Sequence, residues 1–402
     1  MVWEYRKLGD VCRLINGRAY KKHEMLSEGP YPLLRVGNFF TNRGWYYSDL
    51  ELDSDKYCDD GDLLYAWSAS FGPRIWDGGK VIYHYHIWKI EIDEKLVDKN
   101  YLYYLLDWDK ELIKSEQGAG TTMVHVTKGS MENRILPFPT LEEQKRIVAL
   151  LDQVFADIDQ ARANAETNLK NARELYDSYL QQVFSQRGDG WFESKLEDIC
   201  GFKHGFAFKS EYFTNQSELV LLTPGNFFEE GGYRDRGDKQ KYYDGPFPKE
   251  FLLAKGSLLV AMTEQAVGLL GSPALVPDND IFLHNQRLGL VELKSTYKSK
   301  VNIEFLFHLF NTRYFRAKVQ ESATGLKVKH TSPKKMQAIS VCIPNDVNEQ
   351  KEIAHNLFIL KEKSLELEAI YKNKILKLVE LKNSILEKAF TGELSKSKGI
   401  AA

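Results

Sequence analysis

The sequence has few cysteines, and none is placed for metal or redox chemistry. Cysteine occurs four times in 402 residues, and no two cysteines are close enough to form a Cys-x-x-Cys motif. Cys12 and Cys200 stand beside apolar residues, as small buried thiols do. No apolar run reaches the roughly 18 residues of a membrane-spanning helix, and the first ten residues lack the apolar stretch of a secretory signal. We therefore expect a cytoplasmic protein without a metal site, a cofactor or a membrane partner.

An excess of basic residues is also missing. The chain has 54 Lys and Arg against 56 Asp and Glu, a net charge of −2. Residues 1–140 carry 18 basic and 21 acidic groups, and residues 189–346 carry 20 and 19. Any surface for nucleic acid must therefore be a local basic patch. The near-neutral charge leaves open an adaptor protein with a coiled-coil rod and two protein-binding heads.

Motifs of common enzyme classes are absent from the sequence. There is no Gly-x4-Gly-Lys-Ser/Thr phosphate loop and no Asn/Asp-Pro-Pro-aromatic motif of an amino-methyltransferase. Pro277-Asp278 followed by Glu292-Leu-Lys294 resembles the carboxylate pair of a Mg²⁺-dependent nuclease. The spacing is loose and the first half has no equivalent Pro-Asp, so a nuclease remains an alternative. We expect no catalytic residue in this chain.

Proline and glycine are missing from two long stretches, which predicts two long helices. Glycine is absent from Leu141 to Arg187 and from Asn345 to Thr391, and each stretch begins just past a proline. Apolar residues recur at steps of three, four or seven, as in a coiled-coil seam. The predicted seams are Ile147, Leu151, Val154, Ile158, Ala161, Ala165, Ala172, Tyr176, Tyr179 and Val183, and then Leu357, Leu360, Leu367, Tyr371, Leu378, Leu381 and Ile385. Alternatively, each helix buries its stripe on its own domain.

The two halves of the chain repeat each other. Residues 3–12 return as 191–200 at an offset of 188, and Glu-Gln-Lys at 143–145 returns at 349–351 at an offset of 206. This repeat is too long for a solenoid unit and indicates a duplicated domain with its helix. Two similar surfaces related by an approximate two-fold axis suit duplex DNA.

These patterns together predict the fold class and the domain boundaries. Residues 1–140 and 188–345 are rich in glycine, aromatic residues and short apolar runs, which indicates α+β domains with β-rich cores. We predict that two such globular domains are separated by two helices of about 60 Å that pack as an antiparallel coiled coil. The helices are predicted at 141–187 and 346–394, with a flexible tail at 395–402.

Several stretches resemble one known family. Pro-Phe-Pro-Thr-Leu-Glu-Glu-Gln-Lys-Arg-Ile at 137–147, its echo at 343–353, and Ala-Phe-Thr-Gly-Glu-Leu at 389–394 are similar to the DNA specificity subunit of type I restriction-modification systems. The strands Gly-Asp-Leu-Leu-Tyr-Ala-Trp-Ser at 61–68 and Gly-Ser-Leu-Leu-Val-Ala-Met-Thr at 256–263 fit that family's target-recognition domains. The first helix lacks the Thr-Gly-Glu-Leu ending, which changes its link to the second domain but not the architecture.

The resemblance implies a non-catalytic DNA-binding role. In such proteins each target-recognition domain reads one half of a bipartite DNA sequence, and the helices set the unread spacer. Two methyltransferase subunits dock on the specificity subunit, and an endonuclease-translocase subunit joins the complex. Leu175 and Ile375, which lie off the predicted seams, are candidate docking positions.

Candidate base-reading residues follow the two Gly-x-Leu-Leu strands. Side-chain amides, carboxylates and guanidinium groups can bond to base edges in the major groove. Asn285, Gln286 and Arg287 stand together and offer two amides and a guanidinium, although Asn285 and Gln286 could instead satisfy backbone groups in a turn. The residues after the strands are Ser68, Ser70, Arg74, Thr263, Glu264 and Gln265.

Basic clusters provide candidate phosphate contacts, with a solvated surface run as the alternative. Their members are Arg18, Lys21, Lys22, His125, Lys128, Lys209, Arg234, Arg236, Lys239, Lys241, Lys327, Lys329 and His330. His84 and His86 alternate on a strand-like run and are interpreted as packing or surface residues. The duplicated pairs Phe39-Phe40 and Phe227-Phe228 are expected to pack in the fold rather than stack on bases.

Overall fold

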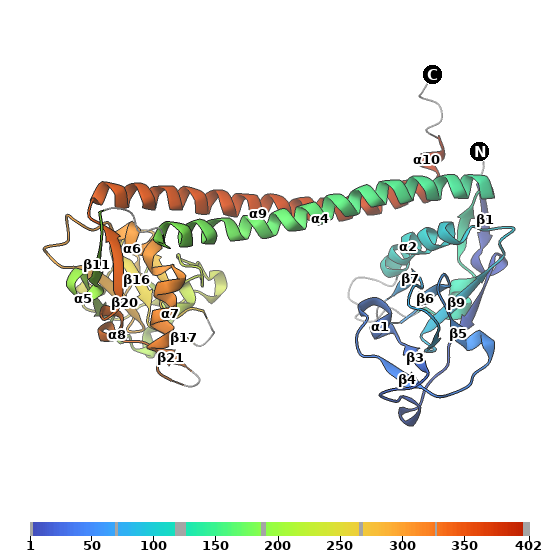
Figure 1. Ribbon diagram of the computed structural model, residues 1–402, viewed down its shortest axis with the longest axis horizontal. Coiled ribbons are helices and arrows are strands. Elements are labelled where there is room, and N and C mark those ends of the chain that lie inside the picture. Colours follow the sequence, from blue (N-terminus) through green and yellow to red (C-terminus); the bar gives the residue numbers. More distant parts are fainter. Residues whose placement is uncertain are drawn as a thin grey trace, which may run out of the picture. The chain divides into compact units, whose positions relative to one another are not determined.

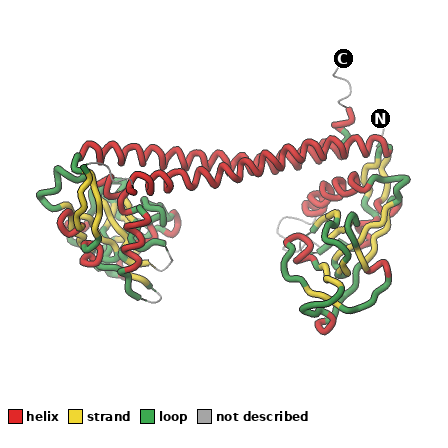
Figure 2. Tube along the Cα trace, in the orientation of Figure 1, coloured by secondary structure: helices red, strands yellow, loops and turns green. Residues whose placement is uncertain are grey.

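The computed structural model describes residues 3–68, 71–116, 126–185, 190–264, 268–325 and 328–396. The chain divides into two compact units, one formed by Met1–Glu166 with Lys372–Ala402 and the other by Thr167–Tyr371. Each unit joins a globular part that contains strands to segments of two long helices (Figure 1, Figure 2). This content confirms the predicted α+β class. In the described ranges, no helix has both the length and the apolar character needed to cross a membrane.

The globular part of unit 1 is built from short strands around one longer helix. Its strands are β1 (Glu4–Lys7), β2 (Cys12–Asn16), β3 (Tyr31–Leu34), β4 (Tyr46–Ser48), β5 (Tyr57–Cys58), β6 (Leu63–Ala66), β7 (Gly72–Ile75), β8 (Val81–Tyr83), β9 (Ile87–Ile92) and β10 (Ile135–Phe138). Its helices are α1 (Val36–Thr41), α2 (Lys99–Glu116), α3 (Lys128–Glu132) and α10 (Glu393–Lys396), with 3-10 turns at Leu8–Asp10, Lys22–Glu24 and Ser54–Lys56.

Unit 2 repeats this plan with its own elements. Its strands are β11 (Trp191–Lys195), β12 (Cys200–His204), β13 (Phe213–Thr214), β14 (Val220–Leu221), β15 (Tyr242–Tyr243), β16 (Leu258–Ala261), β17 (Thr263–Glu264), β18 (Pro273–Leu275), β19 (Phe282–Leu283), β20 (Leu288–Leu293), β21 (Lys329–His330) and β22 (Ser340–Pro344). Its helices are α5 (Leu196–Ile199), α6 (Ile303–Phe310), α7 (Arg313–Glu321) and α8 (Pro333–Gln337), with 3-10 turns at Ser210–Tyr212, Pro224–Asn226, Gly237–Lys239 and Lys249–Phe251.

The sheets of the two units correspond in order and in strand direction. Unit 1 contains a sheet ordered β2-β9-β6-β7, and unit 2 a sheet ordered β12-β20-β16-β18. A second sheet in each unit includes one parallel pair, in which Leu33 faces Ile82 in unit 1 and Val220 faces Phe282 in unit 2. Strand β6 is buried along its whole length, as is β16, because each runs through the middle of its sheet. The sequence repeat is therefore a repeat of folded domains.

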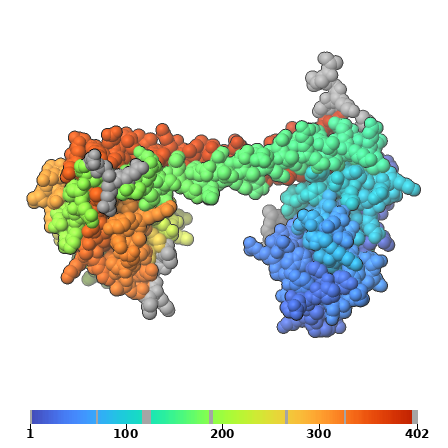
Figure 3. All heavy atoms as spheres, viewed as in Figure 1, coloured from blue at the N-terminus to red at the C-terminus, as the bar shows by residue number. Residues whose placement is uncertain are grey.

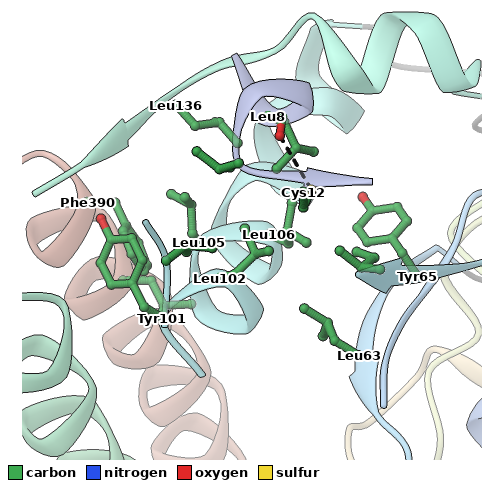
Figure 4. Packing of buried hydrophobic residues seen from close by; sticks show 14 of the residues in the cluster. Leu8, Cys12, Leu63, Tyr65, Tyr101, Leu102, Leu105, Leu106, Leu136 and Phe390 are labelled. Atoms are coloured by element: carbon green, nitrogen blue, oxygen red, sulfur yellow. Dashed lines mark hydrogen bonds between the residues drawn. The ribbon is translucent and has the colours of Figure 1, made fainter. Parts of the chain in front are cut away.

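The core of unit 1 includes residues from α2 and from the end of the second long helix. Figure 4 shows Tyr101, Leu102 and Leu105 of α2 with Phe390 nearby. The rings of Tyr101 and Phe390 lie 5.4 Å apart, centroid to centroid. Cys12 is buried in the same core, where its thiol donates to the Leu8 carbonyl at 3.4 Å. Burial raises the pKa of the Cys12 thiol to about 12, so the thiol stays protonated at neutral pH.

The two predicted long helices are present as α4 (Leu141–Ser185) and α9 (Val347–Phe390). Within each unit their segments lie side by side and run antiparallel (Figure 1). In unit 2 the Ser364 hydroxyl donates to the Ala172 carbonyl, and Arg173 pairs with Glu368 at 3.2 Å. In unit 1 the Lys382 ammonium lies 3.7 Å from an Asp159 carboxylate oxygen.

Two of the three alanines of the predicted seam are buried and Ala161 is partly buried, but two seam positions are wrong. Ala165 and Ala172 are 1% and 4% exposed, so the facing helix does approach closely there. Tyr179 and Leu381 are instead 39% and 47% exposed. Leu180, 1% exposed, takes the buried position that the spacing assigned to Tyr179. From Ala172 the buried residues follow steps of four, because this segment packs on the globular part of unit 2 as well as on α9.

The duplicated glutamines of the Glu-Gln-Lys motif join each long helix to its globular part. The Gln144 amide donates to the carbonyls of Leu96 and Pro139 and accepts from the Asp98 amide. Gln350 makes the equivalent three bonds in unit 2, to the carbonyls of Lys300 and Pro344 and from the Asn302 amide. Both side chains are fully buried. The motif is thus explained by a structural requirement at each helix start.

Candidate nucleic-acid interface

One turn occupies the same place in both units. In unit 1, residues 84–86 connect β8 of one sheet to β9 of the other. In unit 2, residues 284–287 connect β19 to β20, and residues 285–287 are the part equivalent to 84–86. We call both segments the intersheet turn. The Ile87 amide donates to the His84 carbonyl at 2.9 Å, and the Leu288 amide donates to the Asn285 carbonyl at 3.0 Å. The two turns are therefore closed by equivalent hydrogen bonds.

A glycine-led segment supports each intersheet turn from one side. In unit 1, the Arg18 amide donates to the Tyr83 carbonyl and the Arg18 carbonyl accepts from the Tyr85 amide, both at 3.1 Å. Phe206 makes the equivalent bonds in unit 2, to His284 at 2.9 Å and from Gln286 at 3.0 Å. The preceding residues are Gly17 and Gly205, at each of which a Cβ atom would lie 2.2–2.3 Å from a backbone oxygen of the turn region. The close approach explains why glycine is repeated there.

The residue that directly follows each Gly-x-Leu-Leu strand supports the turn from the other side. The Trp67 amide donates to the His86 carbonyl at 3.1 Å, and the Met262 amide donates to the Arg287 carbonyl at 3.0 Å. In unit 2 the Thr331 amide then donates to the Met262 carbonyl. Segments predicted separately as DNA contacts are therefore neighbours in the folded unit.

Unit 2 gathers polar side chains from three segments at this place. Gln286 and Arg287 are exposed on the intersheet turn. Strand β21 pairs with β17, so that Lys329 lies opposite Glu264 and His330 opposite Thr263. Figure 1 shows β17 and β21 together at one edge of the unit. Within the described part of the chain, the Arg287 guanidinium has no hydrogen-bond or ion-pair partner, which leaves it available to a ligand.

Unit 1 carries aromatic and imidazole side chains at the equivalent turn. Tyr85 is 38% exposed, and its ring centroid lies 3.9 Å from that of His86. The Trp67 ring is 4.9 Å from the His86 ring, and its indole N–H donates to the Tyr85 carbonyl at 2.8 Å. Burial lowers the pKa of His84 to about 4, so this ring is neutral at pH 7. The sequence interpretation missed this turn, although Ile87–Ile92 corresponds to Leu288–Leu293 at an offset of 201.

Two predicted arginines are engaged within the protein. The Arg18 guanidinium forms a two-bond pair with Glu24, at 2.7 and 3.1 Å. This hydrogen bonding lowers the pKa of the Glu24 carboxyl to about 2. Arg74 donates to the Phe39 carbonyl and pairs with Asp77 at 2.6 Å. Either arginine would have to leave these partners to contact a base.

Three polar candidates are buried, and two of them, Asn285 and Glu264, bond within the protein. Ser68 is 5% exposed, Asn285 9% and Glu264 4%. The Asn285 side-chain oxygen accepts from the Arg287 amide at 3.0 Å, which is the turn role that competed with base reading. The Glu264 carboxylate accepts from two backbone amides and from the Gln320 side chain. Burial and internal bonding argue against contact with DNA at these positions.

The predicted lysines are mostly surface residues. Lys128 and Lys209 are exposed and lie 3.6 Å from Glu132 and Glu211, respectively. Exposed ion pairs of this kind are weak and could be exchanged for phosphate. Lys21 is also exposed. Four candidates lie outside the described residues: Ser70, His125, Gln265 and Lys327.

The phenylalanine pairs divide between core and surface in the same way in both units. Phe39 and Phe227 are buried, at 0% and 2% exposed, as predicted for fold residues. Phe40 and Phe228 are 42% and 41% exposed, so the prediction of packing holds only for the first member of each pair.

The possible nuclease pair gains no support from the described residues. Asp278 lies 4.0 Å from the Lys255 ammonium, and both side chains are exposed. No group of three or more His, Cys, Asp or Glu side chains is placed to hold a metal ion within the ranges that the structure describes.

A family model matches most of the chain in two copies. The family is described as the type I restriction modification DNA specificity domain, and it matches residues 2–168 and 188–377. Two curated relatives are similar over nearly their whole length. The MjaVIII specificity subunit of Methanocaldococcus jannaschii is 25% identical, covering 94% of this chain and 92% of that protein. The EcoBI specificity subunit of Escherichia coli is 23% identical, covering 98% and 86%.

Solved structures share the fold. A chain from a study of complex assembly and conformational transition in a type I R-M system matches with a TM-score of 0.73 at 17% identity, covering 96% of this chain and 97% of that one. The HsdS subunit of Thermoanaerobacter tengcongensis matches with a TM-score of 0.60 at 18% identity, covering 97% of both chains. At these identities the likeness concerns the fold alone.

Proposed function

The chain belongs to the type I restriction modification DNA specificity family, and from this premise we propose that it is the sequence-specific DNA-binding subunit of a type I restriction-modification complex. Its role is recognition, and the catalytic steps belong to partner subunits. Residues 1–140 and 188–345 are the two target-recognition domains, each reading one half of a bipartite target. The helices at 141–187 and 346–394 set the number of unread base pairs between the halves.

The observation that carries this proposal is the intersheet turn. The same backbone hydrogen bonds hold it in both units, but the side chains differ. Tyr85 is exposed and His86 partly buried in unit 1, whereas Gln286 and Arg287 are both exposed in unit 2. A shared framework with different exposed donors and acceptors suits two domains that read unlike sequences. We therefore expect a non-palindromic target.

Phosphate contacts are assigned to exposed basic residues rather than to the paired arginines. Phosphate contacts position a protein on DNA without reading sequence. Lysines that are exposed, or held only by a weak surface ion pair, can make such contacts at little cost. The proposed residues are Lys21, Lys128, Lys209, Lys329 and His330.

Partner docking is assigned to exposed apolar positions on α9. Leu365 and Ile370 in unit 2 are 56% and 58% exposed, and Leu376 in unit 1 is 63% exposed. Large apolar side chains on a helix surface are typical of protein interfaces. We propose that two methyltransferase subunits cover these positions and that the endonuclease subunit joins through the complex. Leu175 of α4 is 42% exposed and suits the same role, whereas Ile375 is only partly exposed.

The proposal is tested by DNA binding at several salt concentrations. Binding of the purified complex to its duplex should weaken steeply as salt rises, because phosphate contacts release counterions. Footprinting should show two protected half-sites roughly 34–36 Å apart on one side of the duplex. Absence of any salt-dependent DNA binding would favour the adaptor alternative. Metal-dependent cleavage by the chain alone would favour the nuclease.

A further inference from the structure

The repeat separates the residues that build the intersheet turn from those that it exposes. The four backbone bonds that hold the turn in one unit each have an equivalent in the other. The side chains at the two turn positions do not repeat, since Tyr85 and the partly buried His86 correspond to Gln286 and Arg287 at an offset of 201. A position with a fixed backbone and variable side chains is suited to determining specificity.

In unit 2 the backbone of Arg287 is fixed on both sides of its Cα atom. Its amide donates to the buried Asn285 side chain at 3.0 Å, and its carbonyl accepts from Met262 at 3.0 Å. Asn285 therefore positions the arginine, while the guanidinium itself remains without a partner among the described residues. Little backbone ordering would be required when this side chain binds, which favours affinity.

The two turns offer different hydrogen-bonding groups. A guanidinium presents parallel donors that match O6 and N7 of guanine, and the neighbouring amide of Gln286 can both donate and accept. In unit 1 the turn carries an exposed phenol and a partly buried imidazole instead, and neither supplies that pair of parallel donors. The unit 1 turn therefore cannot read guanine in the same bidentate way.

We propose that the intersheet turn is a two-residue specificity element in each unit. Gln286 and Arg287 determine a guanine-containing position of the half-site read by unit 2. Tyr85 and His86 determine the corresponding position of the half-site read by unit 1. This inference rests on the proposed function and assigns each half of the target to its unit.

The direct experiment places the unit 1 residues in the unit 2 turn. The variant Gln286→Tyr with Arg287→His is expressed with the methyltransferase subunit of the same system in a host lacking other DNA methylation, and methylated sites are sequenced. We expect the unit 2 half of the motif to change at one or two adjacent positions, while the other half and the spacer stay the same. An unchanged motif, or a change in the other half, would overturn the assignment.

Two single variants test the role of Arg287 and do not depend on the double variant accumulating. Arg287→Ala should reduce discrimination for guanine at one position by about 10–100-fold, the usual cost of a lost bidentate contact. Arg287→Lys keeps the charge but not the paired donors, so it should relax the same position. If Arg287 instead contacts phosphate, Arg287→Ala leaves the motif intact and lowers the salt dependence of binding, which also overturns the proposal.

Lys298→Ala is the matched control, because Lys298 is an exposed basic residue beyond the other end of β20. It should leave the motif unchanged. The wild-type chain separates this inference from the proposed function. If the wild-type chain directs no methylation motif at all, the proposed function fails. If the wild-type chain directs a motif and the turn variants leave that motif unchanged, only the turn assignment is refuted.

Discussion

Replacing Gln350 by leucine should selectively destabilise unit 2. The Gln350 side chain is fully buried and makes three hydrogen bonds to backbone groups. Its oxygen accepts from the Asn302 amide at 2.9 Å, and its nitrogen donates to the carbonyls of Lys300 at 3.0 Å and Pro344 at 2.8 Å. Leucine has a similar size but makes none of these bonds.

The expected cost follows from the groups left without partners. A buried donor or acceptor that loses its partner costs about 1–3 kcal/mol. The Asn302 amide loses its acceptor, and the two carbonyls lose one donor each but can be partly satisfied by water. We therefore expect a loss of about 3 kcal/mol in the unfolding free energy of unit 2. With an m value of roughly 2–3 kcal/mol/M in urea, the midpoint should fall by about 1–1.5 M.

Urea unfolding followed by hydrogen exchange with mass spectrometry measures this effect by segment. Protection should fall in residues 297–310 and at the start of α9. Gln160→Leu is the control. Among the described residues, the exposed Gln160 side chain hydrogen-bonds to the exposed Asn164 alone, so its loss should change stability by less than about 0.5 kcal/mol. Equal urea midpoints for the Gln350 and Gln160 variants would refute the argument that Gln350 stabilises the contact between α9 and the globular part of unit 2.

Three further predictions concern pH, spacing and salt. Burial lowers the pKa of His308 to about 3 and of His284 to about 4. A histidine in the unfolded chain titrates near 6.5, so between about pH 6.5 and 4 the unfolded chain binds more protons than the folded chain. Unit 2 should therefore lose stability as pH falls through that window, by up to about 1.4 kcal/mol per pH unit for each histidine. His308→Gln should flatten the loss seen in urea unfolding, and an unchanged slope would contradict this assignment. Inserting seven residues between Ala161 and Ala165, with seven in the facing part of α9, should lengthen the unread spacer by about three base pairs. A methylation motif with an unaltered spacer would contradict the spacing model. Lys329→Ala should lower the slope of log K against log salt by about one without altering the motif, and a changed motif would show that Lys329 reads bases.

The fold was predictable because the repeat and the helix patterns depend on residues that the backbone structure requires at particular positions. Glycine at 17 and 205 is required by a close backbone approach, and Gln144 and Gln350 each make three buried bonds. Such residues cannot vary freely, so they mark equivalent positions even where other residues differ. The seam was less predictable near Tyr179, because that part of α4 packs on two neighbours rather than one.

The candidate site was only partly predictable, because whether a side chain is free to contact DNA depends on neighbours that lie outside the sequence motif. Arg18 and Arg74 have the right chemistry, but Glu24 and Asp77 engage them in the folded chain. Asn285 and Arg287 are neighbours in sequence, yet one is buried in the turn and the other exposed. The unit 1 turn escaped notice because its residues share no identity with those of unit 2. The two turns are equivalent in their backbone hydrogen bonds, which cannot be inferred from the residue types.

The central claim is that this chain selects the DNA sequence at which a type I complex acts. The most direct measurement is single-molecule methylome sequencing of a host that expresses the methyltransferase subunit of the same system, with and without this chain. The account predicts a bipartite, non-palindromic methylated adenine motif that appears only when the chain is present. A methylation pattern that does not depend on the chain would contradict it.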